Sequence, residues 1–237
     1  MRILGLEDTS LVDWDGKTVS VIFLGGCNLA CPFCHNLALA RSEPGDPAFP
    51  EVPWEAIEEV LTRRPGMRDG ACITGGEPMM HPEVFGLCRR VKELGLEVKV
   101  DTNGCFPYRL AELIDRGLCD FVALDIKAPL GDRYTLAAGR PVDPVLLRRT
   151  IRLLLEGRVG YEFRSTLVPG LIDPGDIETI GESVRGAARF TLQHYVPESA
   201  PTQLFRERGT YTRAQAEGMA ERLRPFVKEV RLRGKFL

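Results

Sequence analysis

The chain has 237 residues, of which 44% are hydrophobic and 27% are charged, and its formal net charge at pH 7 is −2. This composition suits one folded domain with a large core, so we expect residues 1–237 to form a single domain. The small net charge gives no electrostatic case for nucleic acid as a partner. No apolar run approaches the ~20 residues of a membrane-spanning helix, which argues against a membrane partner.

Cysteine usage indicates the compartment. The chain holds seven cysteines, an odd number, and three of them are packed into one short segment. This pattern favours a reducing environment over a framework of disulfides. Residues 1–15 also lack the basic region and apolar stretch of a signal peptide, so we expect a cytoplasmic protein.

In chain order, two kinds of segment alternate. Apolar, β-branched runs predict strands at 19–24, 71–74, 98–101, 121–125, 163–168 and 190–196, with a short last strand at 230–232. Apolar residues at helical spacing predict helices at 54–61, 82–94, 110–114, 145–155, 177–184 and 212–226. The alternation favours an α/β fold with a parallel sheet, and the length fits a partial TIM-like (β/α)6 barrel.

Three cysteines follow the first predicted strand, namely Cys27, Cys31 and Cys34. Three clustered thiolates can hold three irons of a 4Fe–4S cluster and leave the fourth iron open for chemistry. From the residues alone, an alternative is a zinc site made of these cysteines and His35, because Cys3His is a known set of zinc ligands.

Polar or glycine-rich clusters follow the next three predicted strands. Their members are Gly75, Gly76, Glu77, Asp101, Thr102, Asn103, Asp125 and Lys127. Because the C-terminal ends of strands in a (β/α) fold meet at one rim, we expect these clusters to converge on the cysteine segment. Paired glycines let a backbone approach a ligand closely. The alternatives are ordinary turns and caps for the first two clusters, and a structural ion pair for Asp125 with Lys127.

These motifs resemble those of the radical S-adenosylmethionine (SAM) superfamily. The chain is especially similar to the activating enzymes of glycyl radical proteins, and among them to the short anaerobic ribonucleoside-triphosphate reductase activating proteins. The segments that carry the resemblance are 9–13, 21–28, 31–36, 74–78, 101–104 and 125–129. They lie in roughly the first half of the chain.

The resemblance implies a set of cofactors and roles. Cys27, Cys31 and Cys34 would bind a 4Fe–4S cluster whose open iron is chelated by SAM. The implied SAM contacts are Phe33 beside the adenine, Gly75, Gly76 and Glu77 at the methionine amino group, and Lys127 at the carboxylate. Asp101, Thr102 and Asp125 match a monovalent-cation site near that carboxylate, and Asn103 belongs to the same motif.

The resemblance also implies a reaction and partners. Reductive cleavage of SAM would give a 5′-deoxyadenosyl radical, which removes hydrogen from a backbone glycine of a partner glycyl radical enzyme. Reduced flavodoxin or ferredoxin would supply the electron. One alternative is a radical SAM enzyme that acts on a small molecule such as a deazapurine precursor. Another is a non-catalytic iron–sulfur or zinc protein.

Several residues near the predicted rim receive no role from the sequence. They are Cys105, Arg164, Gln193 and His194. The remaining cysteines, Cys72, Cys88 and Cys119, fall within apolar patterns and are expected in the core. The paired arginines Arg148 and Arg149 are expected on a solvated face.

Overall fold

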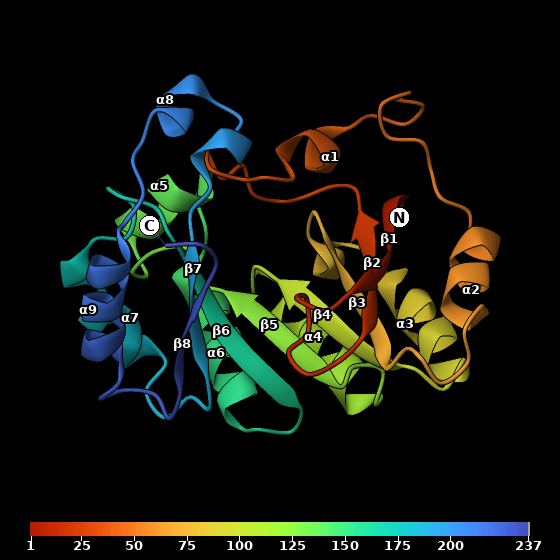
Figure 1. Ribbon diagram of the computed structural model, residues 1–237. Helices are drawn as coiled ribbons and strands as arrows, with labels where there is room; N and C mark the ends of the chain where they lie inside the picture. Colours follow the sequence, from red (N-terminus) through yellow and green to blue (C-terminus); the bar gives the residue numbers. More distant parts are fainter. Residues whose placement is uncertain (237) are drawn as a thin grey trace.

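The computed structural model describes residues 1–236, in which eight strands form one sheet and pair in chain order (Figure 1). The strands are β1 (Ile3–Ser10), β2 (Val19–Leu24), β3 (Gly70–Gly75), β4 (Glu97–Thr102), β5 (Phe121–Asp125), β6 (Gly160–Leu167), β7 (Phe190–His194) and β8 (Val230–Arg233). Strand β1 pairs antiparallel with β2, and every later neighbour pairs in parallel. The predicted α/β fold with a partial TIM-like barrel is therefore confirmed, and the described strands leave the barrel open between β8 and β1.

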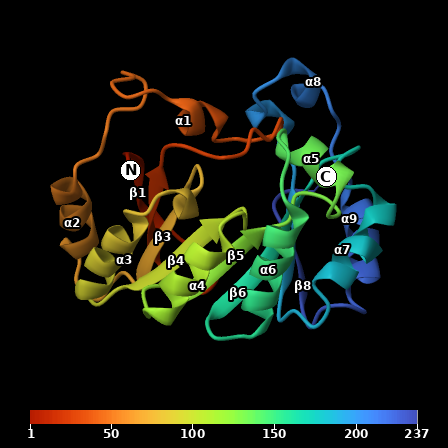
Figure 2. The same cartoon turned by 180° about the vertical axis from the view of Figure 1, so that it is seen from behind.

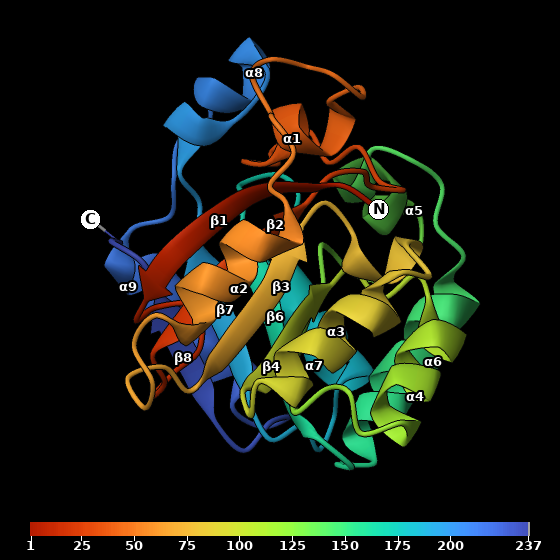
Figure 3. The same cartoon turned by 90° about the vertical axis from the view of Figure 1, so that its right-hand side faces the viewer.

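Helices alternate with the parallel strands. They are α1 (Leu37–Arg41), α2 (Trp54–Thr62), α3 (Val84–Glu93), α4 (Pro107–Asp115), α5 (Asp132–Ala138), α6 (Pro144–Leu155), α7 (Ile177–Ser183), α8 (Gln203–Arg206) and α9 (Arg213–Leu223), with 3-10 turns η1 (Pro78–Met80), η2 (Pro174–Asp176) and η3 (Pro197–Ser199). Figures 2 and 3 show α3, α4 and α6 on the outside of the sheet. No helix of the described chain is long and apolar enough to cross a membrane.

Local sequence explains how these helices begin and which side they bury. Helix α6 begins at Pro144, whose missing N–H is harmless in the first turn, and the Asp143 carboxylate accepts a hydrogen bond from Val145 N at 2.8 Å. One face of this helix is buried through Leu147, Thr150, Ile151 and Leu154. The spacing of these residues is that of one helical stripe against a core.

The two faces of the sheet differ in chemistry. On β4, Val98 and Val100 are fully buried in the core between sheet and helices. The alternate residues Lys99 and Asp101 point to the barrel interior, where they form an ion pair. On β4 the helices therefore cover an apolar outer face, while the side toward the interior carries charged groups.

The loop between β1 and β2 fills the barrel interior at the N-terminal ends of the parallel strands. Trp14 is 5% exposed and packs with Val19, Val21 and Cys72 in a small apolar cluster of its own. Its ring lies 5.6 Å from that of Phe121 on β5. We call residues 11–17 the floor loop.

Candidate active site

A cavity of about 310 Å³ lies at the C-terminal ends of strands β2 to β7. All twelve residues predicted to hold a cluster or SAM line this one cavity. They are Cys27, Cys31, Phe33, Cys34, Gly75, Gly76, Glu77, Asp101, Thr102, Asn103, Asp125 and Lys127. The structure thus brings together segments that lie almost a hundred positions apart in the chain.

The cysteine segment is a loop that neighbouring elements hold in place. Ala30 N donates a hydrogen bond to the carbonyl oxygen of Ala138 at 2.9 Å, and Cys34 N donates to the Cys31 carbonyl at 3.1 Å. Leu29 N donates a hydrogen bond to the Cys27 Sγ at 3.4 Å. Backbone donors toward a sulfur suit a thiolate that ligates a metal.

The three thiols form a donor set that fits an iron–sulfur cluster. Burial raises the pKa of the Cys27 thiol and raises that of Cys31 to about 11, so these thiols are protonated until a metal displaces the proton. The three thiols line one cavity, and in a cluster each of them would bind a different iron. His35 lines the same cavity.

The paired glycines after β3 serve the contact with the cysteine loop. A Cβ on Gly76 would lie 1.7 Å from the carbonyl oxygen of Gly26, so no other residue fits there. Glu77 N donates a hydrogen bond to that same oxygen at 2.8 Å. Gly76 thus makes a close backbone approach to the start of the cysteine loop, and the approach to a ligand expected from the sequence stays a prediction.

Glu77 ties the ends of β3 and β4 together. Its side chain is buried, and its carboxylate accepts hydrogen bonds from Thr102 Oγ1 at 2.7 Å, Asn103 N at 2.7 Å and Met79 N at 3.0 Å. Burial raises the pKa of Glu77 to about 7, although these donors oppose the rise. Through these hydrogen bonds the carboxylate fixes the positions of Thr102 and Asn103 at the end of β4.

A chain of alternating charges crosses the cavity. Arg164 Nη1 lies 3.1 Å from Asp101 Oδ2, and its Nε lies 2.8 Å from Asp125 Oδ1. Lys99 contacts Asp101 at 3.1 Å, and Lys127 contacts Asp125 at 3.6 Å. Burial opposes ionisation of Asp101, but Arg164 and Lys99 outweigh it and lower its pKa to about 2.

Sequence reasoning missed Lys99 and placed Arg164 near the rim without a role. In the structure Arg164 stands between Asp101 and Asp125, two of the residues assigned by resemblance to a monovalent cation. Glu77 and Asp13 line the same cavity, so Arg164 and Lys127 are set among four carboxylates. The sequence signal that could have revealed Lys99 is its position two residues before Asp101, on the same side of a strand whose neighbouring residues Val98 and Val100 are apolar.

The other candidates divide between the cavity and the core. Gln193 lines the cavity, whereas His194 packs edge-on against Phe236 with ring centroids 5.1 Å apart. Cys105 is partly buried and does not line the cavity. The expectation that Cys72, Cys88 and Cys119 lie in the core is confirmed by their burial.

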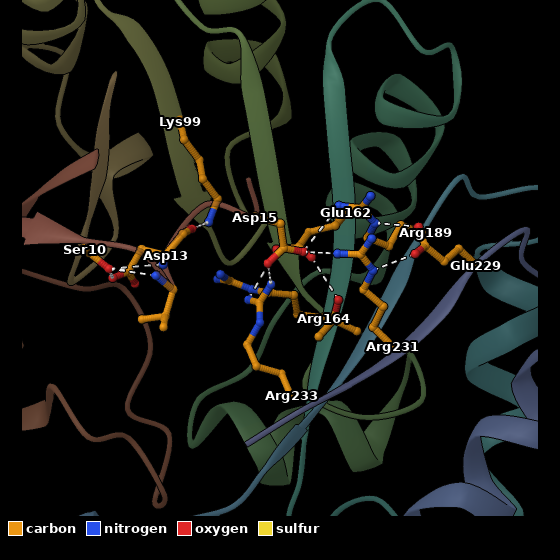
Figure 4. A network of polar contacts seen from close by, with 12 residues as sticks. Ser10, Asp13, Asp15, Lys99, Glu162, Arg164, Arg189, Glu229, Arg231 and Arg233 are labelled. Carbon is orange, nitrogen blue, oxygen red and sulfur yellow. Dashed lines mark hydrogen bonds and ion pairs between the residues drawn. The ribbon is translucent and has the colours of Figure 1, made fainter. Parts of the chain in front are cut away.

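The floor loop closes the opposite end of the interior, and a polar network fixes it (Figure 4). Lys99 Nζ donates to the Asp13 carbonyl, and Asp13 itself lines the cavity. The Asp15 carboxylate pairs with Arg231, with Arg233 at 3.2 Å and with Arg189 at 3.6 Å. These contacts join the first loop of the chain to its last strand.

Comparison with known proteins agrees with this geometry. The family model described as "Radical SAM superfamily" matches residues 21–184. The chain belongs to the radical SAM superfamily. It is 33% identical over 211 residues to a protein of Methanocaldococcus jannaschii assigned as a glycyl-radical enzyme activating enzyme, covering 86% of this chain and 84% of that protein. The expectation of a radical SAM enzyme of the activating type is confirmed.

Further relatives and a solved structure extend the comparison. The chain is 32% identical over 143 residues to the pyruvate formate-lyase-activating enzyme of Clostridium pasteurianum, with 59% of this chain and 58% of that protein covered. It is also 32% identical over 94 residues to the 7-carboxy-7-deazaguanine synthase of a Synechocystis species, with 40% and 42% covered. A domain of the pyruvate-formate lyase-activating enzyme from Bacteroides vulgatus has the same fold, with a TM-score of 0.57 at 20% identity over 70% of this chain and 99% of that domain.

Proposed function

We propose that this radical SAM protein activates a glycyl radical enzyme of the anaerobic ribonucleotide reductase type by removing hydrogen from a backbone glycine. The observation that carries the proposal is the shared cavity, in which three cysteines face the polar ends of five other strands. A relative assigned as an activating enzyme that matches over most of both chains supports it. Flavodoxin or ferredoxin is the proposed source of the electron.

Each part of the cavity has a proposed role. Cys27, Cys31 and Cys34 hold the cluster, and Phe33 packs beside the adenine of SAM. When bound, the cluster supplies one electron that breaks a carbon–sulfur bond of SAM, and this creates the hydrogen-abstracting radical. The buried walls keep water away from the reacting groups.

Two cations at the cavity wall are the groups to which we assign the carboxylate of SAM. Arg164 is buried and Lys127 is 15% exposed, and both contact Asp125. Lys127 lies 3.6 Å from Asp125, so its ammonium is the less tightly held of the two. A monovalent cation at Asp101 and Asp125 would compete with Arg164, which contacts both carboxylates, so we propose SAM binding without such a cation.

The surface around the cavity end suits a protein substrate. Helices α1, α5 and α8 lie at the same end of the molecule (Figures 1 and 2). Leu136 on α5 is 67% exposed and Leu204 on α8 is 65% exposed. Large exposed apolar side chains beside a cavity are typical of surfaces that another protein covers.

The test is anaerobic reconstitution with iron and sulfide, followed by addition of dithionite and SAM. We expect 5′-deoxyadenosine, and a glycyl radical signal in electron paramagnetic resonance when an anaerobic ribonucleotide reductase is present. Changing Cys27, Cys31 and Cys34 to Ala should abolish both. A cluster-loaded protein that binds SAM but leaves the reductase without a radical would contradict the proposed substrate.

A second candidate is chemistry on a small molecule. Similarity to 7-carboxy-7-deazaguanine synthases favours it, although the match covers less than half of both chains. Its test is the appearance of 7-carboxy-7-deazaguanine in the same reconstituted reaction.

A further inference from the structure

A basic groove runs between helices α4 and α6 on the outside of the barrel. Arg148, Arg149 and Arg152 of α6 line it, and across from them stands Tyr108 of α4. The Arg149 guanidinium lies 4.6 Å from the Tyr108 ring centre. Tyr108 is 66% exposed and Val145, at the same end of the groove, is 65% exposed. We call this surface the α4/α6 groove.

The charge of this groove is not neutralised by its neighbours. Within residues 1–236, none of its three guanidinium groups pairs with a carboxylate. Glu156, at the far end, pairs with Arg158 at 3.2 Å, and Asp115 of α4 pairs with the same arginine. Asp143 caps α6 through Val145 N. A chain with a net charge of −2 thus holds a local surface of uncompensated positive charge.

The groove begins where both helices adjoin the cysteine loop. Helix α4 starts shortly after Asn103, whose Nδ2 donates to Asn28 Oδ1 at 2.8 Å and lies 4.0 Å from the Cys27 Sγ. Helix α6 starts shortly after Gly139, where a Cβ would lie 2.1 Å from the Ala30 carbonyl oxygen. Thr150 of α6 donates to the Gly104 carbonyl at 2.7 Å and locks the two sides together.

We propose that the α4/α6 groove docks an acidic electron-transfer protein of the flavodoxin type, which delivers the electron to the group that the cysteine loop holds. The inference rests on the proposed function, since it names the surface that the electron donor uses. The step is a transfer of one electron: the donor is oxidised by one electron, the iron–sulfur group is reduced by one, and no atom passes between the proteins.

Complementary charge accounts for the choice of partner. Unpaired charges at the rim of a contact mainly raise the rate of encounter with an oppositely charged protein, and salt screens this effect. Tyr108 and Val145 supply the apolar contact next to the arginines. The segments that lead into both helices contact the cysteine loop through Asn103 and Gly139, so docking at this end of the groove places the donor on the elements that adjoin the cluster.

The test compares two reductants on one variant. The triple variant Arg148→Gln/Arg149→Gln/Arg152→Gln should lose at least about tenfold in the rate of 5′-deoxyadenosine formation driven by reduced flavodoxin at low salt. With dithionite its rate should equal that of the unchanged protein. Calorimetry with oxidised flavodoxin and the cluster-free chain should show binding that the triple variant and added salt both weaken.

A matched control comes from the neighbouring surface around helices α2 and α3. The variant Arg64→Gln/Arg89→Gln/Arg90→Gln removes three exposed arginines, one of them stacked on an aromatic ring as Arg149 is. It should keep the flavodoxin-driven rate. An equal loss of the flavodoxin-driven rate in both triple variants would overturn the proposal. It would also be overturned if the groove variant binds and uses flavodoxin normally but loses binding to a single-stranded oligonucleotide. Absence of product with dithionite in the unchanged protein would instead contradict the proposed function.

Discussion

The two ends of the barrel interior are both held by carboxylate–arginine contacts, but their settings differ. At the cavity, Arg164 is 8% exposed and lies between Asp101 and Asp125. At the floor, Asp15 contacts Arg231 and Arg233, whose side chains are 38% and 26% exposed. In the first set Arg164 and Asp101 are nearly buried and only Asp125 is partly exposed, whereas every side chain of the second set stays in contact with water.

The difference indicates different uses of similar chemistry. Burying charges costs more than their attraction repays unless all of them are well paired. The cavity end therefore carries an energetic cost that a bound ligand would offset. The floor contacts are screened by solvent and individually weak. They connect the β1–β2 loop to β8 at the side of the barrel where the edge strands β1 and β8 do not pair with each other.

The largest effect is expected from Arg164→Met. Removing the guanidinium leaves Asp101, which is 13% exposed, and Asp125, which is 34% exposed, with only one lysine each. Loss of a fully buried partner destabilises by about 3 to 5 kcal/mol, and the exposure of Asp125 places the expected loss at the low end of this range, about 3 kcal/mol. Urea unfolding should show this as a lower midpoint with little dependence on salt, because buried charges are poorly screened. The pKa of Asp101, which Arg164 lowers, should rise in the same variant.

An exposed ion pair provides the control for this change. Arg224 pairs with Glu221 at 3.2 Å, and its side chain is 63% exposed. Arg224→Met should change the free energy of unfolding by less than about 1 kcal/mol. If the two variants lose the same stability, burial does not distinguish the cavity network from the surface.

A smaller effect, visible as a pH dependence, is expected from Glu77→Gln. The pKa of Glu77 is raised from 4.5 to about 7 in the folded protein. Between pH 4.5 and about 7, therefore, Glu77 stays protonated in the folded protein but is ionised in the unfolded chain. The ionised form is disfavoured in the fold, and the contribution of this group to stability is therefore lost as pH rises from 4.5 to about 7. The loss amounts to at most about 3 kcal/mol.

The measurement is the free energy of unfolding at a series of pH values for the unchanged protein and the variant. The difference in unfolding free energy between the unchanged protein and the variant should change between pH 4.5 and about 7 and be constant at higher pH. A difference that stays constant throughout would mean that Glu77 has the same pKa in the fold as in the unfolded chain. Asp101 acts in a separate window, because its lowered pKa contributes stability that is lost only as pH falls toward 2.

Much of the cavity end could be predicted from local sequence. Each parallel strand is a short apolar run, and polar motifs such as Asp101 to Asn103 stand directly at strand ends, so topology alone brings them together. Their roles could not be predicted in the same way. For example, the sequence did not show that Gly76 also makes room for Gly26 O, a contact between loops far apart in the chain.

The floor and the edge of the sheet were not predictable. Strand β1 was missed because Ile3–Ser10 mixes glycine and acidic residues with apolar ones and lacks the run typical of buried parallel strands. The short helices α1, α5 and α8 have too few turns to show a period. The contact of Asp15 with Arg231 joins residues 216 positions apart, and no local pattern encodes such a pair.

The smallest effect is expected from Asp15→Asn at the floor. The change removes the shared partner of Arg231, Arg233 and Arg189, although Glu229 still accepts from Arg189 at 2.9 Å and from Arg231 at 2.6 Å. Because these groups are partly exposed, we expect a loss of about 1 kcal/mol that shrinks as salt is raised. Hydrogen exchange should quicken in residues 11–17 before it does so in the cysteine loop. A loss as large as that of Arg164→Met, unaffected by salt, would mean that the floor loop is fixed by buried charges and that the two ends of the barrel are alike.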